Sequence, residues 1–227
     1  MPKDIVSGDF YFFHDFSEKG PGRNNDDSKN DTEYIIAAAD CTGHGVPGAL
    51  MSMIVHEKLV YAMKKYNEPS HILKMINQKV KDSLKQHQNE GSSRDGCDIA
   101  LCKITKDTLS YSGANRPLYA YYKNGEFAEI KATKSAIAGF TSYDQDFEQT
   151  DIPIKDLTAV YLFSDGFADQ FGGEKSKKIT TKRFKELLST FIHLPVKEQK
   201  DLLASFYEGW RGKLDQIDDV LVIGIKF

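Results

Sequence analysis

The sequence predicts an α+β fold made of layered strands and helices. Segments rich in aromatic and β-branched residues, which are typical of strands, come in runs, and pairs of helix-like segments separate these runs. The two kinds of segment do not alternate one for one, as they would in a doubly wound sheet or an α/β barrel. A strong hairpin signal, Asn124-Gly125, lies between two of the strand-like segments.

The predicted strands fall into three groups along the chain. Residues 5–13 are rich in aromatic and β-branched side chains, and residues 33–40 form the apolar run of a buried strand. Between them, residues 17–31 have the Gly, Asn and Asp content of a loop. The other predicted strands cover residues 98–104, 108–112, 118–122, 127–131, 158–163 and 220–227.

Four helices are predicted around these strands. Residues 46–66 carry a proline in the first turn and an apolar set at helical spacing, expected to face the core. A second helix is expected over residues 70–88, capped by Ser70, a third around Phe184–Phe191, and a fourth from Pro195 to beyond Trp210. The apolar set of the first helix is Val46, Ala49, Leu50, Met53, Ile54 and Tyr61.

Composition narrows the class of protein. The chain of 227 residues is 40% hydrophobic and 28% charged, which is typical of globular proteins, and its net charge of −3 does not favour nucleic acid or an acidic membrane surface as a partner. No apolar run has the roughly 20 residues of a membrane helix. Three cysteines without a Cys-x-x-Cys pair, and no signal peptide, predict a cytoplasmic protein. The abrupt start favours the trimmed edge of a longer protein over a natural start.

Three aspartates stand where apolar strands are expected to end or begin. Asp40 ends one strand, Asp165 ends another, and Asp218 comes just before a third. Carboxylates at such places are costly unless a positive charge neutralises them, and none of the three segments carries a Lys or Arg close to its Asp. A hard divalent cation with oxygen ligands would satisfy them together, so the pattern predicts a metal site, of a hydrolytic kind.

The segment Asp40-Cys-Thr-Gly-His-Gly45 is the strongest local signal. Its glycines allow a tight turn, and they leave Asp40 beside exposed backbone carbonyls, which are also ligands for a hard cation. A glycine-rich strand-to-helix turn with a capping Asp remains the alternative interpretation. No Gly-Lys-Ser/Thr follows, which disfavours a nucleotide phosphate loop. His44 is open to two readings, a proton donor to a leaving group or a residue of the turn.

Further motifs follow in order along the whole chain, and together they resemble a known family. They are Val6-Ser-Gly-Asp-Phe-Tyr11, Ala39-Asp-Cys-Thr-Gly-His-Gly-Val-Pro-Gly-Ala-Leu-Met-Ser-Met53, Asp98-Ile-Ala-Leu101, Tyr111-Ser-Gly-Ala-Asn-Arg-Pro-Leu-Tyr119, Leu162-Phe-Ser-Asp-Gly-Phe-Ala-Asp-Gln-Phe-Gly-Gly173 and Asp218-Asp-Val-Leu-Val-Ile-Gly224. The chain resembles the SpoIIE-type bacterial branch of the metal-dependent Ser/Thr protein phosphatases, the PPM or type 2C superfamily.

The resemblance implies a fold and a site. The fold is a central antiparallel β-sandwich flanked by helix pairs, in α-β-β-α layers, formed by residues 1–227 as a single phosphatase domain. Two Mn²⁺ or Mg²⁺ ions are expected at one edge, with Asp40 bridging them, the Cys41 carbonyl on the second ion, and Asp165 and Asp218 on the first. Asp9 is expected to act through metal-bound waters, and Asp219 to point elsewhere. No arginine clamp for phosphate is evident in the sequence, so phosphate binding is expected to depend on the metals.

The resemblance also implies a function and partners. The expected reaction is hydrolysis of phosphoserine or phosphothreonine on a regulatory protein by a metal-activated water, with an anti-sigma-factor antagonist as one candidate substrate. The chain is expected to be the C-terminal output domain of a longer protein, in which an upstream sensor domain and dimerisation regulate the activity. A catalytically weak or inactive phosphatase-like docking module is the alternative, and a nucleotide-binding switch protein is disfavoured by the missing phosphate-loop Lys.

Overall fold

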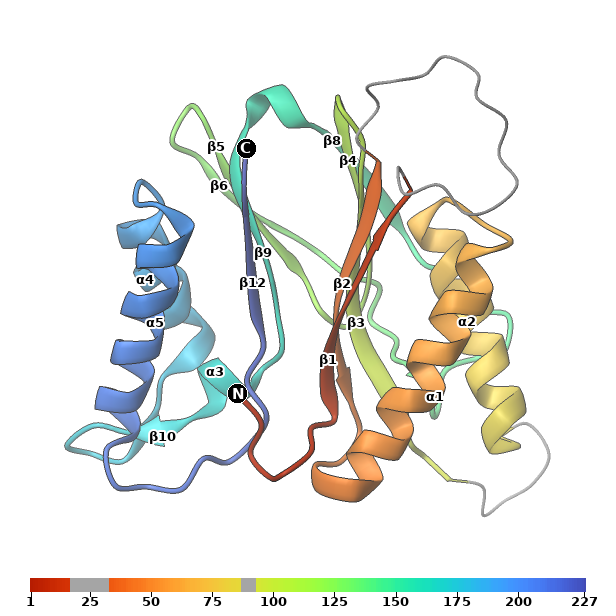
Figure 1. Ribbon diagram of the computed structural model, residues 1–227, viewed down its shortest axis with the longest axis horizontal. Helices are drawn as coiled ribbons and strands as arrows, with labels where there is room; N and C mark the ends of the chain where they lie inside the picture. The colour runs from red at the N-terminus through yellow and green to blue at the C-terminus, as the bar shows by residue number, and fades with distance from the viewer. Residues whose placement is uncertain (17–32, 87–92) are drawn as a thin grey trace.

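The fold consists of two antiparallel sheets packed face to face, with a pair of helices covering each outer face (Figure 1). The computed structural model describes residues 1–16, 33–86 and 93–227. The expected loop at 17–31 and the last two residues of the expected second helix, 87–88, lie outside the described residues. The expected α+β sandwich in α-β-β-α layers is confirmed. Among the described residues, no helix is long and apolar enough to cross a membrane.

The first sheet contains the N-terminal strands. Its order is β1-β2-β3-β4-β8, and the short β7 pairs with β3. Every pairing in it is antiparallel. The strands are β1 (Asp9–Asp15), β2 (Tyr34–Cys41), β3 (Gly96–Ile104), β4 (Thr108–Ala114), β7 (Ile137–Ala138) and β8 (Gln149–Pro153).

The second sheet has the order β12-β9-β5-β6, also antiparallel throughout. Its strands are β5 (Leu118–Tyr122), β6 (Phe127–Ile130), β9 (Leu157–Phe163) and β12 (Val222–Lys226). The chain passes from the first sheet to the second between β4 and β5, and a 3₁₀ turn, η1 (Ile154–Asp156), leads from β8 back into β9. A small hairpin, β10 (Phe171–Gly172) with β11 (Lys177–Lys178), follows the short helix α3 (Gly166–Asp169).

The core has three apolar layers because side chains alternate along each strand. On β2 and β3, Ala37 and Leu101 face helices α1 (Gly45–Met63) and α2 (Pro69–Leu84), whereas Ala38 and Ala100 lie in the layer between the sheets. The third layer joins β5 and β9 to helices α4 (Thr180–Phe191) and α5 (Val196–Arg211). The carboxylates described below lie at one end of the middle layer.

Two expectations about the N-terminal half are wrong. Residues 5–8 are not part of β1, which begins at Asp9, and Ile5 is fully exposed. Residues 1–8 instead run beside the segment before β12, where Met1 and Val220 exchange backbone hydrogen bonds. Ser70 does not cap α2, whose N-cap is Glu68, because Pro69 already occupies the first helical position.

The apolar face assigned to α1 is also wrong. The helix buries Met51, Val55, Leu59, Ala62 and Met63 against the first sheet. Most of the expected set is exposed instead, namely Val46, Leu50, Met53 and Tyr61. The helix is apolar on more than one side, so helical spacing did not determine which side faces the sheet.

Candidate active site

Three aspartates lie side by side across the first sheet. Asp40 of β2 pairs with Asp9 of β1 on one side and with Asp98 of β3 on the other. Ala38 and Ala100, two residues away from Asp40 and Asp98, have side chains between the sheets. Because residues i and i+2 of a strand share a face, Asp40 and Asp98 point toward the second sheet.

The second sheet brings two more aspartates to the same end. Asp165 follows β9 and Asp218 precedes β12, and these neighbouring antiparallel strands place the two close together. Ser164 fixes the arrangement, since its N–H donates to the Leu221 carbonyl at 3.0 Å and its hydroxyl accepts the Leu221 N–H at 3.0 Å. A Cβ on Gly166 would lie 1.9 Å from the Asp219 carbonyl oxygen, so only glycine allows this approach.

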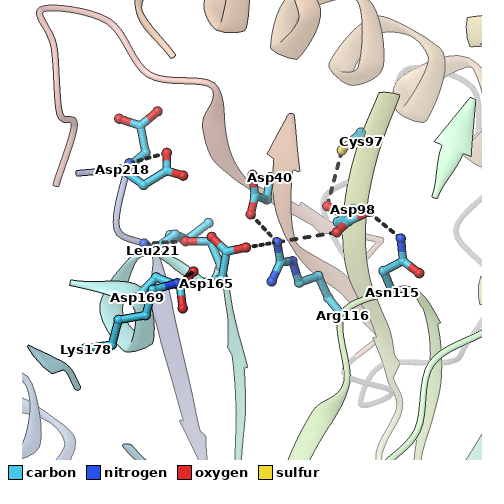
Figure 2. A network of polar contacts seen from close by, with 12 residues as sticks. Asp40, Cys97, Asp98, Asn115, Arg116, Asp165, Asp169, Lys178, Asp218 and Leu221 are labelled. Atoms are coloured by element: carbon cyan, nitrogen blue, oxygen red, sulfur yellow. Dashed lines mark hydrogen bonds and ion pairs between the residues drawn. The ribbon is translucent and has the colours of Figure 1, made fainter. Parts of the chain in front are cut away.

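Arg116 joins the two sets of carboxylates (Figure 2). A single guanidinium nitrogen, NH2, lies 2.6 Å from Asp40 Oδ2, 2.7 Å from Asp165 Oδ2 and 3.4 Å from Asp98 Oδ2. The residue stands in the turn between β4 and β5, where the chain passes from one sheet to the other. Its side chain is largely buried, with 15% exposed. The arginine therefore connects both sheets through their acidic ends.

The turn that carries Arg116 is held from several directions. Asn115 has the left-handed φ of 57°, which asparagine tolerates better than most residues. Its side-chain amide donates to Asp98 Oδ1 at 2.8 Å, and the Tyr111 hydroxyl donates to the Arg116 carbonyl at 2.6 Å. These contacts fix the main chain and leave movement to the arginine side chain.

The loop after Asp40 packs tightly against the start of α1. A Cβ on Gly48 would lie 2.2 Å from the Gly43 carbonyl oxygen, so this approach requires glycine. His44, for which the sequence left two roles open, lies half exposed at the rim, where Nδ1 is 2.7 Å from Asp4 and Nε2 is 3.1 Å from Lys3 Nζ. The loop is thus clamped between α1 and the N-terminal segment.

Asp219 has a different surrounding from Asp218. It is 2% exposed, and its two oxygens accept the backbone N–H groups of Lys3 at 2.7 Å and Gly8 at 2.8 Å. Its carboxylate therefore holds residues 3–8 against the end of the second sheet. Asp218 accepts the Asp219 N–H at 2.8 Å and lines the cavity described next.

A cavity of about 700 Å³ opens over these acids. Its lining combines the acidic ends of both sheets with the loop after Asp40 and the segment around β7. The residues are Asp40, Cys41, Thr42, Gly43, His44, Arg94, Gly96, Cys97, Asp98, Asn115, Lys134, Ser135, Ala136, Gly139, Phe140, Thr141, Asp165 and Asp218.

Burial and mutual repulsion raise the pKa of several of these carboxyl groups. Burial raises the pKa of Asp40 to about 8, because the attraction of Arg116 offsets only part of this effect and Asp9, Asp165 and Asp218 add to it. Burial likewise raises the pKa of Asp9 to about 6, against a hydrogen bond to Ser164. The pKa values of Asp98 and Asp218 are raised for the same principal reason. One arginine therefore offsets only part of the cost of burying these carboxylates.

The donor set suits a hard divalent cation. It consists of carboxylates and backbone carbonyls, and Asp9 Oδ2 is buried without a hydrogen-bond partner. As the side chains stand, however, no group of three Asp, Glu, His or Cys residues within the described part of the chain is arranged to hold one ion. The Arg116 nitrogen lies against the oxygens of Asp40 and Asp165 instead. The residues fit a cation in chemistry, provided that this guanidinium moves.

Most of the expected site residues come together. Asp40, Cys41, Asp165 and Asp218 line one cavity, and Asp9 is the register partner of Asp40. Sequence reasoning missed Asp98 and Arg116, and the expectation that no arginine lies beside the acids is wrong. Asp98 carried the same signal as the others, an acid at the start of an apolar strand. Arg116 had a weaker signal, a charged residue in a tight turn between two buried strands.

Comparisons with known proteins agree with this geometry. The family model "Stage II sporulation protein E (SpoIIE)" matches residues 30–227. Phosphoserine phosphatase RsbU of Bacillus subtilis is 30% identical over 176 residues, which cover 74% of this chain and 45% of RsbU. The chain thus spans less than half the length of this curated relative.

Solved structures give the same result. The SiaA-PP2C domain of Pseudomonas aeruginosa has a TM-score of 0.80 at 28% identity, covering all of this chain and 83% of that one. RsbX, solved in complex with magnesium, has a TM-score of 0.62 at 16% identity, covering 96% of this chain and 86% of that one, and it supports the fold alone. The two-sheet architecture, the acids gathered at one end of it and the match over residues 30–227 lead to one conclusion: the chain belongs to the SpoIIE family of PP2C-type phosphatase domains.

Proposed function

We propose that this protein hydrolyses phosphoserine or phosphothreonine on a regulatory protein. The observation that carries the proposal is the meeting of Asp40 and Asp98 from one sheet with Asp165 from the other, at a cavity of about 700 Å³. Family membership and the likeness to RsbU, which is described as a phosphoserine phosphatase, support the same reaction.

Two Mn²⁺ or Mg²⁺ ions complete the proposed site. Asp40 would bridge them, the Cys41 carbonyl would bind one, Asp165 and Asp218 would bind the other, and Asp9 would orient bound waters. Such ions supply positive charge for the phosphoryl oxygens and lower the pKa of water at neutral pH. The buried Oδ2 of Asp9, which has no hydrogen-bond partner, supports this assignment. The raised pKa of Asp40 supports it too, because the charge of Arg116 offsets only part of the cost of burying that carboxylate.

The chain's own groups favour direct attack by water over a phosphoenzyme. All three cysteines are buried and free. Burial raises the pKa of the Cys97 and Cys102 thiols, which disfavours the nucleophilic thiolate. The carboxylates, in contrast, face the cavity and can orient a water for in-line attack on phosphorus. The proposed role of the protein is therefore to position the attacking water and to polarise the phosphoryl group.

The substrate is proposed to be a folded phosphoprotein of a bacterial partner-switching pathway in the cytoplasm, such as an anti-sigma-factor antagonist. The cavity of about 700 Å³ has room for a phosphorylated side chain presented by a loop. We further propose that residues 1–227 act as one domain, and that an upstream sensor segment regulates it through α1 and α2, in a dimer. The exposed side chains of Val46, Leu50, Met53 and Tyr61 on α1 support such a docking face.

The alternative is a docking module that binds phosphoproteins without turnover. The arginine that now fills the space between Asp40 and Asp165 is the observation in its favour. A docking module of this kind would bind its phosphoprotein partner equally well with and without metal.

One assay separates the two. The purified protein would be given a phosphoserine protein or peptide with Mn²⁺, with Mg²⁺ and with chelator, and release of phosphate would be measured. Metal-dependent release that chelator abolishes is expected. No release with either metal, together with binding of the phosphoprotein, would establish the docking module instead.

A further inference from the structure

Arg116 has two features that a fixed structural ion pair does not explain. Its NH2 nitrogen contacts the oxygens of Asp40 and Asp165, which are the same carboxylates that the proposed function assigns to metal. Its Nε is buried without a hydrogen-bond partner. A buried donor left without an acceptor is destabilising, so the present position leaves this guanidinium incompletely satisfied.

A cation bound to Asp40 and Asp165 and the Arg116 guanidinium exclude each other. They would share the same oxygens, and both are positive, so their close approach is repulsive. The main chain of Arg116 stays in place, because the Tyr111 hydroxyl and the Asn115 side chain hold the turn. The side chain is tethered through its NH2 tip, and it can swing while its Cα stays next to Asn115, which lines the cavity.

We propose that Arg116 is the phosphate-binding residue of this site. Asp40, Asp98 and Asp165 bind its guanidinium until divalent cations displace it. The proposal rests on the proposed function and adds a residue to it. Without metal, the arginine is the internal counter-ion of Asp40, Asp98 and Asp165. With metal, the freed guanidinium faces the cavity, where its planar donors, Nε included, match two oxygens of a phosphoryl group.

The arrangement orders the two binding events. Phosphate and the carboxylates compete for one guanidinium, so the anion binds well only after the cation has taken over the carboxylates. Metal and phosphate therefore bind with positive cooperativity. A site that relied on metals alone would show no such role for Arg116.

The test compares Arg116→Gln and Arg116→Lys with the wild-type protein, and Arg183→Gln is the matched control. Arg183 is an arginine stacked on Trp210, 4.4 Å from the ring centroid, on the far side of the second sheet. Three quantities are measured: melting temperature without metal, Mn²⁺ affinity by calorimetry, and affinity of the Mn²⁺-loaded protein for inorganic phosphate.

We expect Arg116→Gln to lower the melting temperature of the metal-free protein, to leave Mn²⁺ affinity equal or higher, and to weaken phosphate binding about tenfold or more. Arg116→Lys keeps the charge without the planar fork, so it should weaken phosphate binding less. KM for a small aryl phosphate should rise in parallel with the dissociation constant of phosphate. Arg183→Gln should match the wild type in both affinities, and its melting temperature should change only through the lost contact with Trp210.

Two results would overturn the inference. Unchanged phosphate affinity in Mn²⁺-loaded Arg116→Gln would make the arginine a structural counter-ion, and a loss of Mn²⁺ affinity would make it a support of the metal ligands. If the wild-type protein binds no Mn²⁺ and hydrolyses no phosphoserine, the proposed function fails and this inference fails with it. If the wild-type protein binds Mn²⁺ and hydrolyses phosphoserine, the proposed function stands, and either of the two results above contradicts only the role given to Arg116.

Discussion

At the scale of single residues, the acids divide into those that face the cavity and one that holds the main chain. Asp40, Asp165 and Asp218 line the cavity, whereas Asp219 accepts two backbone N–H groups from residues 3–8. Replacing each of them by the isosteric Asn removes the charge and keeps the shape. The four variants therefore separate the role of charge from the role of structure.

Asp40→Asn, Asp165→Asn and Asp218→Asn should each reduce metal-dependent turnover by about 100-fold or more, because each removes a charged ligand of the proposed ions. Turnover of a phosphoserine protein under saturating Mn²⁺ is the measurement. Near-normal turnover in Asp40→Asn would show that the bridging role is wrong. Far-ultraviolet circular dichroism of each variant provides the control for folding.

Asp219→Asn should act mainly on stability. An amide presents one acceptor oxygen where the carboxylate presents two, so one of the N–H groups of Lys3 and Gly8 loses its partner. We expect a loss of about 1–3 kcal/mol in the free energy of unfolding, measured in urea. Turnover should fall less than in Asp218→Asn. A loss of turnover as large as that of Asp218→Asn, with unchanged stability, would assign Asp219 to the chemistry.

The residue scale also shows what sequence can predict of a site. The strand-end signal found Asp40, Asp165 and Asp218, because an acid beside an apolar run is unusual whatever the fold. Asp98 had that signal and became conspicuous only through its register with Asp40. Arg116 lies 76 positions from Asp40 in the chain, and its ion pairs follow from the crossing between the sheets, which no local pattern encodes.

At the scale of elements, α1 presents the clearest divergence from the sequence. Its buried stripe and its exposed stripe are both apolar, and the sheet selects between them by contact. Strand positions were easier to predict, because Leu118–Tyr122 and Leu157–Phe163 are buried apolar runs with clear ends. The short β7, β10 and β11 have two residues each, which is too few for any periodicity.

The exposed face of α1 leads to a prediction about regulation. Because α1 begins directly after the Asp40 loop, a shift of about an ångström in the helix would misplace a carboxylate and lower turnover. The 227-residue chain should therefore be weakly active, and a longer form with an upstream segment more active. Equal turnover in the two forms would contradict this.

A surface variant tests the same face. Leu50→Glu with Met53→Glu places charge on exposed positions, so stability should change by less than about 0.5 kcal/mol. The activation given by the longer form should be lost. Lys64→Glu with Lys65→Glu, just after the end of the same helix, is the control and should leave activation in place.

The β10–β11 hairpin leads to a prediction about substrate docking. Lys175 and Lys177 are exposed, and Lys178 forms an ion pair with Asp169 at 2.9 Å. Replacing all three lysines by Ala should weaken turnover of a phosphoprotein and leave an aryl phosphate unaffected, because remote contacts act on the larger substrate alone. Lys178→Ala alone reports the loss of the ion pair.

The control for the hairpin is a set of three other exposed lysines, Lys197, Lys200 and Lys213, replaced by Ala. It changes the net charge by the same amount and should leave both substrates unaffected. An equal fall with both substrates in the hairpin variant would assign the loop to the catalytic site. No change with either would identify it as a solvated loop.

At the scale of the whole molecule, the acidic end of the sandwich makes stability depend on pH. Asp9 and Asp40 have folded-state pKa values of about 6 and about 8, above their ordinary value of 3.8. Between these limits the folded protein binds more protons than the unfolded chain, so its stability falls as pH rises. The contribution is fully present below pH 3.8 and is lost as pH passes through about 6 and about 8.

We therefore expect the melting temperature of the metal-free protein to fall between pH 5.5 and about 8.5, and to fall less in Asp40→Asn, which has no proton to lose there. Saturating Mn²⁺ should raise the melting temperature most at the high end, where the carboxylates are charged. Chelator should reverse this. A melting temperature that does not respond to Mn²⁺ at any pH would contradict a metal site.

The crossing between β4 and β5 has a mechanical consequence. Asp40 and Asp98 belong to one sheet and Asp165 to the other. The small side chains of Ala38 and Ala100 lie between the two sheets. The distance between these aspartates therefore depends on the spacing of the two sheets. A bulkier residue in the middle layer, such as Ala100→Val, would push the two sheets apart. It would thereby weaken the binding of a cation by these aspartates, although residue 100 does not contact the cation itself.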